Sequence, residues 1–190
     1  MIMPKIKICG LSRPADIETV NIEKPDYIGF VFAESKRKVD PVQAADLRKL
    51  LSPDIIPAGV FVNESVENIL SLVRAGIIDV IQLHGTETEE YIAELKSMTD
   101  KIIIKANRRS QSADYLLFDN IIPGSGQTFD WSLIGEINKP YFLAGGLNIE
   151  NIAVAVKLNP FAVDVSSGVE TSGIKDPVKI KEFIRRVRKS

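Results

Sequence analysis

Reactive and metal-binding side chains are scarce in this chain. Its 190 residues include one cysteine, one histidine and one tryptophan. A single cysteine excludes an intramolecular disulfide, and a single histidine leaves no His/Cys cluster with the spacing of a zinc site. We therefore expect no bound metal, and any catalysis must use carboxylates, hydroxyls, lysines or the one thiol.

Excess charge and long apolar runs are missing as well. The 24 lysines and arginines nearly balance the 25 aspartates and glutamates, for a formal net charge of -1. Such a balance gives no overall field that would attract nucleic acid or an anionic membrane. No apolar run approaches the roughly 20 residues of a membrane-spanning helix, and Met1–Gly10 lacks the apolar block of a signal peptide. We expect a cytoplasmic protein with no nucleic-acid or membrane partner.

Short apolar runs bounded by turn residues recur along the chain and predict eight strands. The runs are Lys5–Cys9, Tyr27–Phe32, Ile56–Val62, Val80–Leu83, Lys101–Lys105, Tyr115–Asp119, Pro140–Ala144 and Phe161–Val165. Most of the gaps between them have helical periodicity, over Val42–Leu51, Val66–Ala75, Glu89–Met98, Ile149–Leu158 and Val178–Val187. This alternation predicts a parallel sheet with right-handed crossovers.

The number of repeats favours a closed sheet. Hydrophobic residues make up 45% of the chain, enough for one core, and no linker divides it. We predict a single α/β domain over residues 1–190, a compact (β/α)8 TIM barrel below the roughly 250 residues typical of the class. The fifth helix is expected to be short or missing, because residues 106–114 are mostly polar. An open sheet binding a dinucleotide is the alternative, but the candidate loop Gly124–Phe129 lacks a third glycine.

Two of the predicted strands end in small residues. The seventh is followed by Gly145 and Gly146, and the eighth by Ser166, Ser167 and Gly168. Backbone N–H groups without bulky side chains over them suit an anion. Barrels of this class commonly hold phosphate at the loops after these two strands. We predict one shared phosphate site here.

Polar residues at the carboxyl ends of strands are the candidates for chemistry, because barrel active sites lie there. Alternation along the first strand places Lys7 and Cys9 on one face. A buried lysine must be paired, and we predict that Lys7 pairs with Asp164 of the adjoining eighth strand. Cys9 is either a base, held partly as thiolate by Lys7, or a small buried apolar residue. Asp119, after the sixth strand, is either a site acid or the cap of a turn.

Seven motifs, taken together and in this order, resemble phosphoribosylanthranilate isomerases over nearly the whole chain. They are Lys7–Gly10; Gly29–Phe32 with Ser35–Arg37; Gly59–Asn63; Gln82–Gly85; Gly124–Gly126 with Thr128–Trp131; Ala144–Asn148; and Asp164–Glu170. The resemblance implies an Amadori rearrangement of N-(5-phosphoribosyl)anthranilate to 1-(2-carboxyphenylamino)-1-deoxyribulose 5-phosphate in tryptophan biosynthesis. It implies no metal or organic cofactor, a small phosphorylated sugar-anthranilate substrate, and a monomer or homodimer.

The resemblance also implies roles for individual residues. Cys9 corresponds to the family's general base and Asp119 to its general acid. Arg37 corresponds to an arginine near the anthranilate carboxylate, and the alternative is a solvated charge beside Lys36 and Lys38. His84 is expected to be a structural or wall residue. Asp130 is a competing acid that we interpret as a helix cap.

Two other functions stay open from the sequence. The first is another isomerase or aldolase on a ribulose-phosphate-binding barrel. An aldolase of this kind needs a lysine that forms a Schiff base, and Lys105 is the candidate. The second is a phosphate-binding barrel that has lost catalysis. The presence of both Cys9 and Asp119 argues against it.

Overall fold

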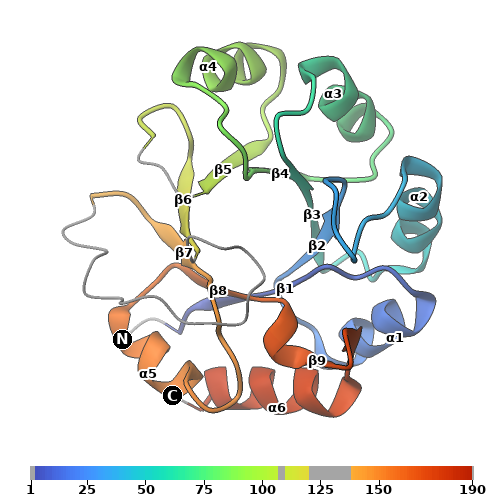
Figure 1. The fold of residues 1–190 in the computed structure, drawn as a ribbon, viewed down its shortest axis with the longest axis vertical. Coiled ribbons are helices and arrows are strands. Elements are labelled where there is room, and N and C mark those ends of the chain that lie inside the picture. Colours follow the sequence, from blue (N-terminus) through green and yellow to red (C-terminus); the bar gives the residue numbers. More distant parts are fainter. Residues whose placement is uncertain (1–2, 107–109, 120–137, 190) are drawn as a thin grey trace.

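A computed structural model of the chain describes residues 3–106, 110–119 and 138–189. Within these residues, eight parallel strands close into a barrel in sequence order, with the helices arranged around its outside (Figure 1). The strands are β1 (Lys5–Cys9), β2 (Tyr27–Val31), β3 (Ile56–Phe61), β4 (Val80–Leu83), β5 (Ile102–Ala106), β6 (Tyr115–Phe118), β7 (Tyr141–Leu143) and β8 (Ala162–Val165). The predicted barrel is confirmed. The open dinucleotide-binding sheet is wrong, because β8 pairs directly with β1.

Four of the six helices in the described residues begin at a side chain that caps them. The six helices are α1 (Pro14–Glu23), α2 (Pro41–Leu50), α3 (Val66–Arg74), α4 (Glu89–Met98), α5 (Ile152–Ala155) and α6 (Pro177–Val187). The side chains of Asp40, Ser65, Thr88 and Asp176 accept hydrogen bonds from the free N–H groups of the first turns of α2, α3, α4 and α6. No helix in the described part of the chain is long and apolar enough to cross a membrane.

The helix predicted over Ile149–Leu158 is shorter than expected. Asn148 Oδ1 accepts from the backbone of Glu150 and Asn151 at 2.8 and 3.1 Å, which holds this segment in a turn. Only α5 follows, continued by the 3₁₀ turn η2 (Val156–Leu158) that ends at left-handed Asn159.

Two other connections differ from an ordinary repeat. Residues 110–114, between β5 and β6, contain no helix, in agreement with the prediction of a short or missing fifth helix. In this turn Ser110 Oγ accepts from Ala113 N at 3.0 Å, and Asp114 Oδ2 accepts from Ile103 N at 2.8 Å. The loop Gly124–Phe129 and the predicted cap Asp130 lie outside the described residues. A short antiparallel hairpin follows β8, formed by β9 (Glu170–Thr171) and β10 (Ile174–Lys175).

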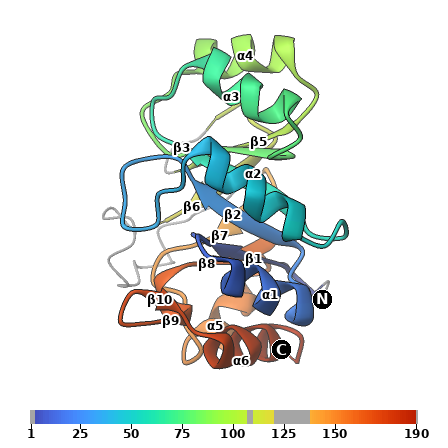
Figure 2. The same cartoon turned by 90° about the vertical axis from the view of Figure 1, so that its right-hand side faces the viewer.

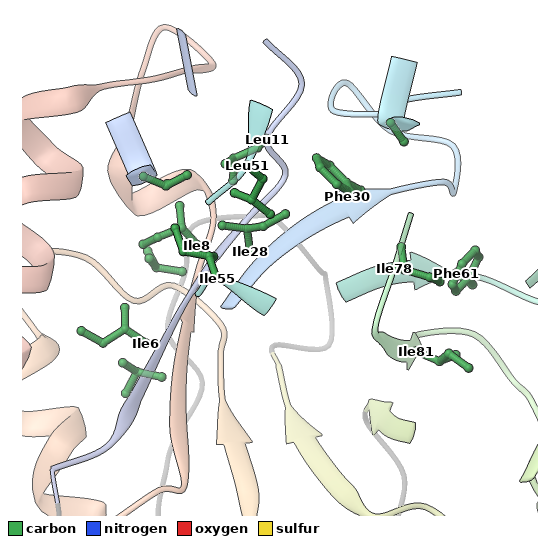
Figure 3. Close-up of a cluster of buried hydrophobic side chains, with 14 of the residues drawn as sticks. Ile6, Ile8, Leu11, Ile28, Phe30, Leu51, Ile55, Phe61, Ile78 and Ile81 are labelled. Atoms are coloured by element: carbon green, nitrogen blue, oxygen red, sulfur yellow. The ribbon is translucent and has the colours of Figure 1, made fainter. Parts of the chain in front are cut away.

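The strands carry apolar side chains on both faces. Ile6 and Ile8 of β1 belong to the large cluster between strands and helices, part of which is drawn in Figure 3. A second cluster includes Tyr27, Ala58 and Phe142 and comes from alternate strand positions. These positions face the barrel interior, because side chains alternate along a strand. The barrel is therefore filled, and an open site forms only beyond the strand ends.

Candidate active site

A cavity of about 350 Å³ lies at the carboxyl ends of the strands. It brings together most of the predicted site residues from distant parts of the chain: Cys9, Arg37, His84, Asp119, Gly145, Gly146, Asp164, Ser166 and Ser167. Of the remaining predicted residues, Lys7 is fully buried beneath it. Gly168 is not among the lining residues. Gln82 also lines the cavity, on the same strand as His84.

The predicted pair between Lys7 and Asp164 is confirmed. Lys7 Nζ lies 2.6 Å from Asp164 Oδ2, and the two side chains are 0% and 6% exposed. The residues are direct neighbours in the β1–β8 register. Burial alone would lower the pKa of Lys7, but Asp164 and Cys9 outweigh it and the pKa is raised. The lysine is therefore a fixed positive charge under the cavity.

Cys9 is the only cysteine and its side chain reaches the cavity although the residue is buried. A Cβ on Gly29 would lie 2.6 Å from the sulfur, so the neighbouring strand leaves room for the thiol only by lacking a side chain. Burial raises the pKa of the Cys9 thiol, and Lys7 lowers it by less. The expectation that Lys7 holds Cys9 partly as thiolate is wrong for the ligand-free protein. The loss of hydration on burial outweighs the attraction of one nearby positive charge.

Asp119 lies beside His84 in the lining of the cavity. His84 Nε2 is 3.5 Å from Asp119 Oδ2, and the two side chains are 12% and 13% exposed. Burial and then Lys7 lower the pKa of His84, so the imidazole is neutral at neutral pH. Gln82 Nε2 lies 3.3 Å from His84 Nδ1 on the opposite side of the ring. His84 thus forms a wall of the cavity next to the predicted acid.

The two predicted phosphate turns adjoin one another. Gly145 and Gly146 have φ of 80° and 66°, a conformation that favours glycine. Asn151 Nδ2 donates to Gly146 O at 2.9 Å and fixes this turn. Gly168 holds the two loops together, since a Cβ there would lie 1.8 Å from the carbonyl oxygen of Leu147. We interpret Gly168 as a residue that permits this close approach rather than one that faces a ligand.

Lys105, the aldolase candidate, does not reach the cavity. Its Nζ donates to Gly85 O at 2.8 Å and to Glu87 Oε2 at 2.9 Å. Both side chains of the pair are 1% exposed. A cation buried and paired in this way is unavailable as a nucleophilic amine, which removes the support for the aldolase alternative. In the described ranges, no three His, Cys, Asp or Glu side chains are grouped to hold a metal ion.

Arg37 follows β2, lines the cavity and forms an ion pair with Glu170 through two hydrogen bonds. Its Nε and Nη2 donate to the two carboxylate oxygens of Glu170 at 2.6 and 2.7 Å. Lys175 donates to the same carboxylate. Sequence reasoning missed Glu170 and Lys175 as site residues. Glu170 is the last residue of the motif Asp164–Glu170, which could have drawn attention to it. Nothing in the sequence around Lys175 indicates that this residue lies near the cavity.

The fold and the position of the cavity define a (β/α)8-barrel protein with an open site at the carboxyl ends of its strands. Proteins of this class frequently bind phosphate at the loops after the seventh and eighth strands. Residues 6–186 match the family model for N-(5'phosphoribosyl)anthranilate (PRA) isomerase. The chain belongs to this family.

Individual relatives agree with the family model over nearly their whole length. A protein of Endomicrobium trichonymphae named N-(5'-phosphoribosyl)anthranilate isomerase is 51% identical over 198 residues, covering 98% of this chain and 99% of that protein. A solved phosphoribosyl anthranilate isomerase in complex with reduced 1-(o-carboxyphenylamino)-1-deoxyribulose 5-phosphate is 35% identical, with a TM-score of 0.85, and covers 99% of this chain and 100% of that one. Monomers generated from the dimeric enzyme of Thermotoga maritima give a TM-score of 0.86 at 35% identity, with the same coverage.

Proposed function

We propose that this protein converts N-(5-phosphoribosyl)anthranilate to 1-(2-carboxyphenylamino)-1-deoxyribulose 5-phosphate in tryptophan biosynthesis. The observation that carries the proposal is one cavity lined by Cys9, Asp119 and the two glycine and serine turns. An aldose-to-ketose rearrangement needs one acid and one base, and the cavity holds a candidate for each in Asp119 and Cys9. The ligand-bound relative supports a substrate of this size and chemistry.

The reaction starts with a proton from Asp119 to the ring oxygen of the furanose. The ring opens to a protonated Schiff base, and Cys9 then takes the proton from C2 to give an enolamine. Tautomerisation of the enolamine yields the ketose. Before substrate enters, burial raises the pKa of the Cys9 thiol and disfavours its thiolate form. Once the protonated Schiff base has formed, its positive charge favours the thiolate.

The phosphate turns contribute binding energy away from the reacting atoms. Holding the phosphate at Gly146 and Ser166 fixes C2 near the thiol and the ring oxygen near the carboxylate. Such remote binding serves orientation as well as affinity.

Gly146→Val should therefore raise KM steeply and also lower kcat. Valine is strained at a φ of 66°, and its side chain would cover the N–H groups that a phosphate needs. Steady-state kinetics of the variant measure both constants. Gly76→Val, at a φ of 67° on the surface with open space around it, is the matched control for strain alone. An unchanged KM in Gly146→Val would mean that the phosphate binds elsewhere.

The function itself is tested by following the fluorescence of phosphoribosylanthranilate as purified protein consumes it. Turnover by the wild type and restored growth of a tryptophan auxotroph that lacks this isomerase are the expected results. Absence of turnover in the wild type would overturn the proposal.

We also infer that the enzyme is cytoplasmic and is a monomer or a homodimer. The dimeric protein of Thermotoga maritima is consistent with a homodimer. Analytical ultracentrifugation of the purified protein measures its oligomeric state.

A further inference from the structure

Two buried charges near the cavity have no part in the mechanism above. Glu170 and Lys175 face each other in the β9–β10 hairpin, and their side chains are 6% and 3% exposed. Figure 2 shows this hairpin on the same side of the barrel as the β2–α2 connection that carries Arg37. Lys175 Nζ also donates to Ser166 O at 3.0 Å, which ties the hairpin to the eighth-strand loop.

The way Glu170 binds Arg37 leaves one edge of the guanidinium without an acceptor among the described residues. A guanidinium presents a side edge, formed by Nε and Nη2, and an end edge, formed by Nη1 and Nη2. Glu170 occupies the side edge through two hydrogen bonds of 2.6 and 2.7 Å. Within the described part of the chain, Nη1 donates to no acceptor, and Arg37 lines the cavity. The end edge is a fork suited to a second carboxylate.

The rest of the Arg37 side chain is held in place as well. A Cβ on Gly10 would lie 2.4 Å from Arg37 Cδ, so the alkyl chain passes over a bare glycine. The backbone N–H of Arg37 donates to Ser35 Oγ at 2.9 Å. Gly10 restrains the alkyl chain, the hydrogen bond to Ser35 restrains the backbone at Arg37, and Glu170 restrains the guanidinium. Less rotamer freedom is therefore left to lose when a ligand binds.

The cluster of Arg37, Glu170 and Lys175 carries a net positive charge. Arg37 and Lys175 contribute two positive charges and Glu170 one negative charge, which leaves one positive charge at the rim of the cavity. A ligand carboxylate completes the balance. Lys175 serves to neutralise the carboxylate that holds the arginine, so that this carboxylate repels an incoming anion less.

We propose that Glu170 is a positioning residue that holds Arg37 side-on, so that its end edge receives the aromatic carboxylate of the substrate. The inference rests on the proposed function. For the affinity of the site for a carboxylate, the positioning role and simple electrostatics predict opposite effects of removing Glu170. Removing the negative charge of Glu170 would strengthen carboxylate binding if charge alone mattered, whereas loss of orientation weakens it.

The test compares Glu170→Gln with wild type on two substrates, N-(5-phosphoribosyl)anthranilate and N-(5-phosphoribosyl)aniline, which lacks the carboxylate. For the first, we expect KM to rise about tenfold with kcat changed less than about threefold, the pattern of lost ground-state binding. For the second, KM should be the same in both proteins. In an Arg37→Lys background, Glu170→Gln should change KM no further, because an ammonium has no edge to orient.

The aniline substrate tests folding within the same variant, and Thr171→Val is the matched control on the hairpin. Thr171 Oγ1 donates to Asp176, outside the cluster, and its loss should leave both KM values unchanged. A KM for the anthranilate substrate that is unchanged or lower in Glu170→Gln would overturn the positioning role. An equal rise for both substrates would also overturn it. If the wild type converts neither compound, the proposed function fails and this inference fails with it.

Discussion

Replacing Cys9 with serine should lower kcat by about 10²–10⁴-fold, the usual contribution of a positioned acid or base. Serine keeps the shape of the side chain, but its hydroxyl loses a proton far less readily than a thiol. KM should change little, because the phosphate turns and Arg37 still hold the substrate. Asp119→Asn should show a loss of the same order, since the N–H of an amide is far too weak an acid to protonate the ring oxygen.

The measurement is steady-state kinetics on phosphoribosylanthranilate, with thermal unfolding to confirm that each variant is folded. Asp46→Asn is a suitable control, because it removes a carboxylate from an exposed position on α2, away from the cavity. Full activity in Cys9→Ser or in Asp119→Asn would remove that residue from the mechanism.

The protonation state of Cys9 in the free enzyme is tested by the pH dependence of its alkylation. Burial raises the pKa of the Cys9 thiol, so the thiol is mostly protonated at neutral pH before substrate binds. Iodoacetamide reacts with the thiolate, so the rate of alkylation should rise with pH into the alkaline range, with a midpoint above that of a free cysteine in a peptide. A midpoint at or below that of a free cysteine would mean that the charge of Lys7 outweighs burial.

The barrel and the placement of its site were predictable because they follow from local patterns. Apolar runs locate the strands, and the cost of burying an isolated lysine was enough to pair Lys7 with Asp164 across 157 positions in the chain. The helix α1 was missed. Its buried face includes Asp16 and Thr19 alongside Ile17 and Val20, so it has no clean apolar stripe.

Quantities that depend on three-dimensional surroundings were not predictable. The sequence shows that Lys7 is near Cys9, but the direction of the thiol pKa depends on the depth of burial as well. The strands β9 and β10 have two residues each, too few for any periodicity to indicate a hairpin. The partner of Arg37 is therefore visible only once the loops after β2 and β8 are placed side by side.

Breaking the buried pair should destabilise the fold more than any other single change near the cavity. Lys7→Met leaves the Asp164 carboxylate beneath the cavity without its cation, and removal of one partner from such a pair costs about 3–5 kcal/mol. The double variant Lys7→Met/Asp164→Asn should recover much of this loss, because neither charge then remains. Urea unfolding curves, fitted for both midpoint and slope, give the free energies of unfolding.

Lys5 supplies the matched control for this pair. It lies two positions earlier on β1 and forms an ion pair with Asp26 at 2.8 Å, but its side chain is 53% exposed. An exposed pair contributes about 0–1 kcal/mol, so Lys5→Met should shift the midpoint only slightly. If Lys7→Met is no more destabilising than Lys5→Met, the cation under the cavity does not stabilise the fold. If the double variant is less stable than Lys7→Met alone, the two side chains contribute independently and the pair is not the source of the stability.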